Sequence, residues 1–199
     1  TLRFYLHFSG PMGGSSAVGH VRLVDAHGEE IEDVLLEIDV DLWNTDYTRR
    51  TVFFDPGRVK RGIRPNRELG RALVAGQRYA IVVGTTWKDA DGRPLSKEFR
   101  HDFTAGPAVE VAVTPTAWSI GPAIVGTRDP VVVEFPWSLD EGLLHRALGV
   151  TWEAVAHSLV VLTLLEDPAG NRVGEPFEFE MFGTPVPDAE RVTLPIPKR

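Results

Sequence analysis

The chain carries one sequence pattern twice, and this repeat restricts the possible folds more than any other feature. The pattern is an apolar strand, a turn containing Asp and Gly, and a second strand with alternating apolar residues. The first copy runs from Tyr79 to Phe103 and the second from Leu159 to Phe182. Short strands separated by Gly, Pro and Asp turns are typical of antiparallel sheets. The repeat therefore predicts an all-β fold with two tandem domains of one architecture.

Composition and charge exclude several classes of function. The 199 residues are 43% hydrophobic and 25% charged, as is ordinary for a soluble globular protein. The formal net charge of -7 argues against general nucleic-acid binding, which needs a basic face. The chain has no cysteine, which excludes thiol catalysis, Cys-based zinc sites and disulfides. No run of 18 apolar residues occurs, so no membrane span is predicted.

The first domain is expected to span residues 1–106. Leu2, Phe4, Leu6 and Phe8 alternate with polar or amphipathic residues, as in a half-buried strand, so the chain is expected to begin inside a domain. The other expected strands are residues 18–24, 34–38, 51–54, 77–83 and 98–103. Asn66 is expected to cap a short helix over residues 67–73, inside a basic helical insert near residues 58–75.

The second domain is expected to span residues 107–199, after the boundary Ala105-Gly-Pro107. The expected strands are residues 109–113, 131–135, 155–165 and 177–182, with one or two helical turns within 139–148. Two prolines make the tail, residues 192–197, extended and unsuited to an inner strand.

The two copies differ in length. Phe8 aligns with Phe135 at an offset of 127 positions, and Gly92 aligns with Gly170 at an offset of 78. Subtracting 78 from 127 leaves 49 residues that the second copy lacks between these landmarks. The helical insert explains part of this difference, and the rest would be a hairpin and a strand equivalent to residues 51–54. We therefore predict a hairpin missing near 150–151, with a break in the chain there.

Local motifs resemble a known family. Asp167-Pro-Ala-Gly-Asn171-Arg-Val173 fits the pattern Asp-x-x-Gly-Asn-x-Val, and the stretch from Asp89 to Leu95 fits it with Arg93 in place of Asn. Both this turn and the opening Phe8-Ser-Gly-Pro-Met12 resemble bacterial Ig-like domains of S-layer and other envelope proteins, as found in tandem in uncharacterised bacterial proteins. The resemblance implies Ig-like β-sandwiches in a bacterial envelope, periplasmic or extracellular setting. It implies no catalytic residues and no cofactor.

The acidic turns are weak calcium candidates through Asp89, Asp91, Asp167 and Asn171. Calcium takes about six or more oxygen ligands, and neither turn has the spacing of an EF-hand loop. The favoured interpretation is structural, because Asp accepts backbone N–H bonds in turns and Gly supplies a positive φ.

A basic run and two tryptophans are the candidates for ligand binding. The basic residues are Arg58, Lys60, Arg61, Arg64, Arg67 and Arg71. They suit an anionic glycan, a lipid head group or an acidic protein surface, although a solvated insert paired with the surplus of Asp and Glu is the favoured alternative. Trp43 and Trp118 are candidates for stacking on sugars, with burial favoured. Trp87 aligns with Leu165 and is expected in a core.

No assembled catalytic motif is found. The histidines, His7, His20, His27, His101, His145 and His157, form no H-E-x-x-H motif, although His7 and His101 lie in strands expected to be close. Residues 13–17 are not a G-x-S-x-G elbow and are expected to form a flexible loop. The paired carboxylates Glu29/Glu30, Glu37/Asp39/Asp41 and Glu178/Glu180 are expected mainly on outward strand faces.

The leading functional prediction is a non-catalytic structural or interaction module of a bacterial envelope or secreted protein. Its expected partners are other domains of a larger polypeptide. The alternatives are a module that binds carbohydrate or an anionic partner through the basic insert and loop tryptophans, and an accessory domain of a hydrolase.

Overall fold

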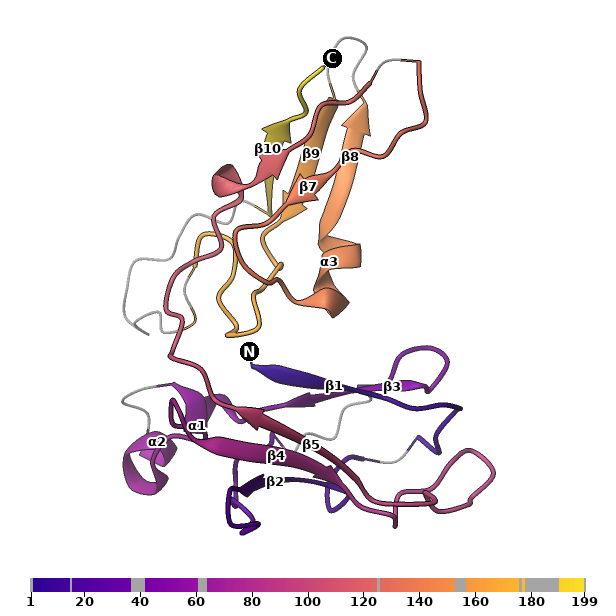
Figure 1. The fold of residues 1–199 in the computed structure, drawn as a ribbon, viewed down its shortest axis with the longest axis vertical. Coiled ribbons are helices and arrows are strands. Elements are labelled where there is room, and N and C mark those ends of the chain that lie inside the picture. Colours follow the sequence, from indigo (N-terminus) through magenta and orange to yellow (C-terminus); the bar gives the residue numbers. More distant parts are fainter. Residues whose placement is uncertain are drawn as a thin grey trace. The chain divides into compact units, whose positions relative to one another are not determined.

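The computed structural model describes residues 2–14, 16–36, 42–60, 64–124, 126–152, 157–175, 177 and 190–198. The chain divides into two compact units, residues 2–108 (the first unit) and residues 109–199 (the second unit). The two units are drawn in Figure 1.

The structure consists mostly of short strands paired in antiparallel sheets, as the repeat predicts (Figure 1). The first unit contains β1 (Arg3–His7), β2 (Val21–Asp25), β3 (Arg49–Phe53), α1 (Pro56–Val59), α2 (Arg64–Leu69), β4 (Arg78–Val83) and β5 (Phe99–Thr104). The second unit contains η1 (Pro115–Ala117), β6 (Ser119–Ile120), β7 (Val133–Glu134), α3 (Glu141–Ala147), β8 (Leu148–Trp152), β9 (His157–Leu162) and β10 (Arg191–Pro195).

The first unit packs two sheets against one core. One sheet pairs β1 with β3, and the other has the order β2-β4-β5. Leu6 and Val52 come from the first sheet and Leu23 and Ile81 from the second, and all four belong to one buried cluster. From Tyr79 onward every residue of β4 is buried, because this central strand is covered on both faces.

The insert of the first unit is helical, but its helices differ from the expectation. α1 begins after Asp55, whose carboxylate accepts the backbone N–H of Gly57 at 2.7 Å. α2 ends at Leu69, and Asn66 lies inside it instead of capping it. The side chain of Asn66 donates to the backbone oxygen of Arg58 at 3.1 Å. The predicted cap was therefore wrong, because Asn66 links the two helices.

The second unit has one sheet with the order β10-β9-β8 and another of β6 and β7. Its core contains Val113, Trp118, Leu159, Val161 and Leu165. The tail is extended, as predicted, and part of it forms β10, which lies at the end of the described sheet, where proline is tolerated.

Two strands predicted for the second unit, residues 109–113 and 177–182, are not found among the described strands. Residues 109–113 do not form the predicted strand; only Val113 makes an isolated bridge, to Val173, and Val109 and Val111 are exposed. The predicted strand over residues 177–182 lies outside the described residues, except for Phe177, which is in a turn. Among the described strands, β10 pairs with the edge of β9 that faces away from β8.

Strand register confirms the alignment of the two copies. Val21 of β2 pairs with Val83 of β4, and Leu148 of β8 pairs with Val161 of β9. These residues differ by 127 and 78 positions, the same two offsets that the sequence motifs give. The same relation holds along both strand pairs to their ends, where Asp25 pairs with Tyr79 and Trp152 with His157.

The length difference between the copies can now be placed in the fold. The 53 residues between Asp25 and Tyr79 correspond to the four residues 153–156 of the second copy, a difference of 49. The long segment supplies β3, α1 and α2 to the first unit. β8 runs through Val150 and Thr151, which pair with Leu159 and Ser158. By strand register, the length difference therefore falls at residues 153–156, a few positions after the predicted 150–151. A missing hairpin in this region stays a prediction.

Candidate functional site

The two acidic turns have the same geometry. The backbone N–H of Arg93 donates to Asp89 Oδ1 at 2.9 Å, and that of Asn171 donates to Asp167 Oδ1 at 2.9 Å. The glycine of each turn has a positive φ, +82° at Gly92 and 90° at Gly170, which suits a residue without Cβ. Each aspartate therefore holds its own turn closed.

Trp87 and Leu165 precede these turns and anchor them in the two cores. Both side chains are 0% exposed, as the alignment predicts. The backbone oxygen of each accepts an N–H from the segment after the turn, from Leu95 for Trp87 at 3.0 Å and from Val173 for Leu165 at 3.2 Å.

The carboxylates of the turns are occupied by protein groups. The second oxygen of Asp89 pairs with the Arg93 guanidinium at 2.9 Å, and Asp91 also pairs with Arg93. In the second unit, Asp167 Oδ2 accepts the side-chain amide of Asn171 at 2.8 Å. No group of three or more metal-ligating side chains occurs among the described residues. The geometry of both turns fits the structural interpretation of the four calcium candidates.

The Asp89 turn gives the first unit a pH-dependent stabilisation. Chiefly the N–H bond from Arg93 lowers the pKa of Asp89 below its usual 3.8, despite opposing desolvation. A carboxyl group with a lowered pKa stabilises the fold above its unfolded pKa, and this stabilisation is lost as pH falls through the folded pKa. We expect Asp89→Asn to flatten the acid limb of the first unit's stability below about pH 4. Urea unfolding at a series of pH values measures this, and an unchanged acid limb would contradict it.

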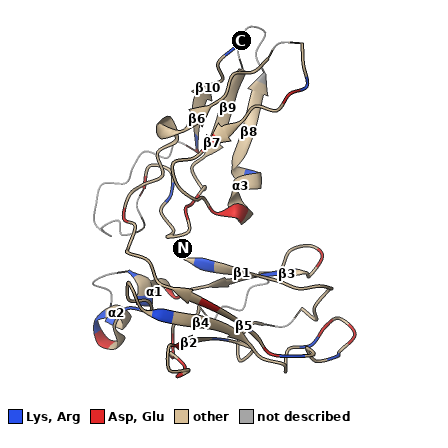
Figure 2. Cartoon of the chain, viewed as in Figure 1, with Lys and Arg blue, Asp and Glu red and all other residues tan. Residues whose placement is uncertain are grey.

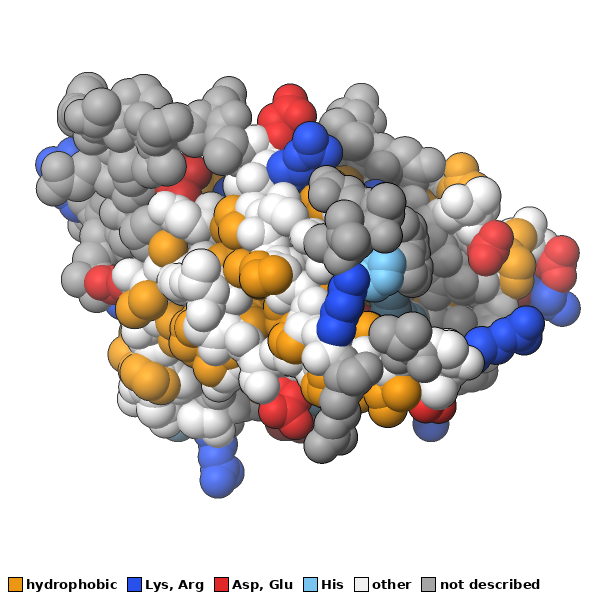
Figure 3. Space-filling view, turned by 90° about the horizontal axis from the view of Figure 1, so that it is seen from above, with side chains coloured by type: hydrophobic (Ala, Val, Ile, Leu, Met, Phe, Trp, Pro, Cys, Tyr) orange, Lys and Arg blue, Asp and Glu red, His pale blue; other side chains and the backbone are white. Residues whose placement is uncertain are grey.

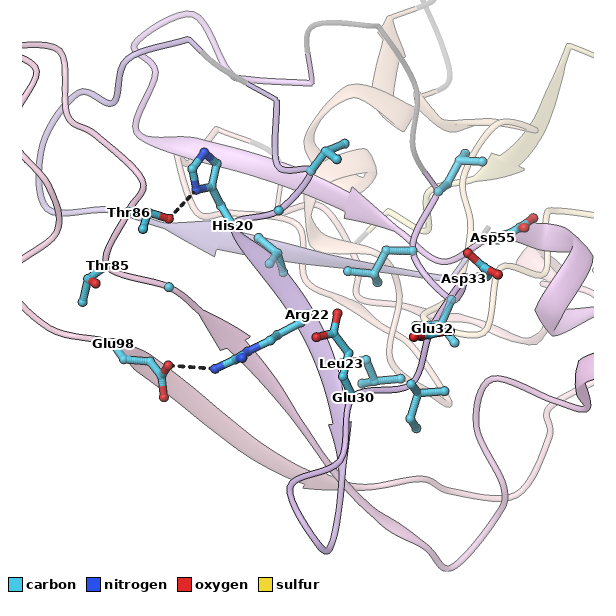
Figure 4. Close-up of a pocket in the computed structure, with 18 residues that line it drawn as sticks. His20, Arg22, Leu23, Glu30, Glu32, Asp33, Asp55, Thr85, Thr86 and Glu98 are labelled. Carbon is cyan, nitrogen blue, oxygen red and sulfur yellow. Dashed lines mark hydrogen bonds and ion pairs between the residues drawn. The ribbon is translucent and has the colours of Figure 1, made fainter.

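A groove of about 850 Å³ runs along the side of β2 that faces away from β4 (Figure 4). Its polar lining comes from His20, Arg22, Glu30, Glu32, Asp33, Asp55, Thr85, Thr86 and Glu98. It forms because β2 pairs with residues 29–31 only over its second half, where the N–H of Ile31 donates to the backbone oxygen of Leu23 at 2.9 Å. This groove is a candidate site of the first unit.

Two pairs of polar side chains line the groove. His20 Nδ1 lies 3.0 Å from Thr86 Oγ1, and its ring stacks on Trp87 at 5.3 Å between centroids. Arg22 Nη2 donates to Glu98 at 3.0 Å. A hydroxyl nucleophile needs a base that is oriented by a third group. His20 has no bond to a carboxylate among the contacts of the described residues, so this hydroxyl–imidazole pair lacks its orienting group.

The basic insert is not a uniform solvated patch. Arg58 is 4% exposed, and its guanidinium donates to the backbone oxygens of Glu32 at 2.7 Å and Gly70 at 3.1 Å. Arg58 therefore fastens the insert to the body of the first unit. Sequence reasoning missed this role, because only the tertiary structure brings these carbonyl oxygens together.

The rest of the basic insert lies nearer the surface. Arg64 is exposed and pairs with Glu68 at 2.8 Å, so opposite charges lie side by side on α2 (Figure 2). Arg67 is exposed, Lys60 and Arg71 are half-buried, and Arg61 lies outside the described residues.

The tryptophan candidates belong to aromatic clusters. Trp43 is half-buried and packs against Phe8 and Trp87, each at 5.5 Å between ring centroids. Trp118 is buried and meets Phe135 edge-on at 4.8 Å. Trp118 therefore has no exposed face for stacking on sugar, while part of Trp43 remains at the surface. Hydrophobic side chains do reach the surface elsewhere, as on the face drawn in Figure 3.

His7 and His101 lie in different sheets, on β1 and β5. The two strands are close, as expected, because the rings of Phe4 and Phe103 lie 5.3 Å apart between centroids. No contact between the two histidines is found among the described residues. Ser15 and the carboxylates Glu37, Asp39, Asp41, Glu178 and Glu180 lie outside the described residues.

Comparisons with family models, curated proteins and solved structures give no match for the chain. The resemblance to bacterial Ig-like domains therefore stays a prediction. Within the described residues, no helix has the length and apolar character needed to cross a membrane.

Proposed function

We propose that the chain is a non-catalytic structural or interaction module built from two tandem Ig-like β-sandwiches. Its setting is the envelope of a bacterium, in the periplasm or outside the cell, as part of a larger polypeptide. What supports the sandwich architecture is that the two sheets of the first unit share a single core. The equivalent strand registers support its duplication.

The observation that carries the proposal is the role of the acidic-turn aspartate, a residue that both copies contain. Asp89 and Asp167 bond to the backbone of their own turns. Residues that a duplicated chain employs to close its turns serve folding and not chemistry. Two domains with separate cores then suit a module that keeps other domains of a larger polypeptide apart or displays them.

Pulling the full chain between tethers at its two ends tests the proposal. Two sandwiches in series are expected to unfold in two separate force steps, each releasing roughly 350 Å of chain, since each unit has about 100 residues. A single cooperative step would contradict it. Hydrolysis of model esters or glycosides, lost in Thr86→Val, would instead favour the hydrolase alternative.

A further inference from the structure

We infer that the edge of β7 facing away from β6 is a docking site for an extended peptide strand supplied by a partner. The strand would take the position that β3 holds in the first unit. This inference deepens the proposed function, on which it rests, because it names the surface through which the module interacts.

The backbone direction of β7, and of Val131 and Val132 just before it, follows from one hydrogen bond. The N–H of Gly121 donates to the oxygen of Val132 at 2.8 Å, so Val132 directs its backbone groups toward the β6 side. Backbone groups alternate in direction along an antiparallel strand. Those of Val131 and Val133 therefore point to the opposite edge, where no pairing is found among the described residues.

In the first unit, β3 pairs with the corresponding edge of β1. At the offset of 127, Val131 and Val133 correspond to Phe4 and Leu6 of β1. Phe4 and Leu6 stand opposite residues of β3. The end bond of this pairing, from Phe54 N–H to the oxygen of Leu2 at 3.0 Å, shows that these even-numbered residues of β1 direct their backbone groups toward β3. The second unit thus retains the receiving strand, while no described residue supplies the strand that pairs there.

Side-chain burial differs in the same way. Leu23 of β2 is 1% exposed, in a cluster with Val34, Val52 and Phe54 from the segment that the second copy lacks. Val150, its counterpart in β8, is 42% exposed. Val150 is exposed because no described strand covers it in the way that β3 covers Leu23 in the first unit.

The first unit also indicates the chemistry of the partner. β3 and the residue after it place Val52 and Phe54 in the core, and alternate them with Thr51 and Phe53, which are half-buried. The partner strand is therefore expected to run antiparallel to β7 and to carry apolar residues at the two positions that correspond to Val52 and Phe54. Strand addition of this kind combines backbone hydrogen bonds with pockets for alternate side chains.

A labelled peptide with the sequence of residues 48–55 is the probe. Saturable binding to the full chain, followed by fluorescence anisotropy, is expected. Val150→Lys, which places a charge beneath the added strand, is expected to weaken binding by about tenfold or more. Val132→Lys is the matched control, since its side chain points to the other face and is exposed, and it is expected to bind as the parent does.

A second peptide, with serine at the positions of Val52 and Phe54, separates sequence-specific docking from adhesion and is expected not to bind. If the parent peptide does not bind, the inference is overturned. This outcome is expected where another segment of this chain, or a second copy of it, already covers the edge of β7. Equal binding to the Val150→Lys protein would overturn it as well. Either result would leave the two force steps of the proposed module unaffected, so the two proposals fail independently.

Discussion

Replacing Trp87 with alanine is expected to lower the free energy of unfolding of the first unit by about 3–5 kcal/mol. The side chain is 0% exposed and lies between three rings, with centroids at 5.3 Å for His20, 5.4 Å for Phe8 and 5.5 Å for Trp43. Such a cluster cannot collapse into the space that the indole leaves, so the cavity adds to the lost apolar burial. Urea unfolding followed by tryptophan fluorescence and circular dichroism measures the change.

The matched variant is Leu165→Ala, at the corresponding position of the second core. It is expected to destabilise the second unit by about 2–5 kcal/mol and to leave the first unchanged. The two units have separate buried clusters, so each variant should shift one transition only. If both variants shifted one common transition by similar amounts, the two units would not be independent.

Asn171→Ala is expected to lower the stability of the second unit by about 2–4 kcal/mol, although the residue lies in a turn. Asn171 is 0% exposed, and its side-chain amide donates to the oxygen of Val109 at 2.9 Å and to Asp167 at 2.8 Å. Its Oδ1 accepts the N–H of Phe177 at 2.8 Å. Alanine removes all these bonds and leaves buried groups without partners, which costs more than the bonds themselves contribute.

Arg93→Ala provides the control at the corresponding position of the first unit. Arg93 is exposed and its ion pairs with Asp89 and Asp91 are solvated, so its removal is expected to change stability little. Thermal unfolding of both variants under the same conditions compares them. A larger effect from Arg93 than from Asn171 would show that the turn sequence, and not the burial of its side chain, determines the contribution.

Much of the fold could be predicted because the repeat is local. Turn residues such as Asp89 and Gly92 form their bonds within five positions, so their pattern in the sequence determines their structure. The strands around the turns follow from apolar alternation or a continuous apolar run, and the offsets of 127 and 78 hold in the observed register. The strand predicted over residues 109–113 was wrong, because alternation alone does not supply a neighbouring strand with which to pair.

The candidate site was less predictable. The basic run is visible in the sequence, but the burial of Arg58 depends on backbone oxygens 12 and 26 residues away. The groove lies beside β2, where residues 29–36 pass the strand. Thr86 and Glu98 line it although they are distant from β2 in the sequence. Neither arrangement has a signature in sequence spacing.

The sequence by itself determined the all-β class, the duplication and the closed acidic turns, since these depend on contacts between near neighbours and on side-chain periodicity. Only the tertiary structure decided which polar groups became buried partners, and which edge of β7 has no strand beside it in the described part. The reason is that hydrogen bonds and burial between distant segments depend on strand order. Strand order is set by the packing of whole sheets and not by any local run of residues.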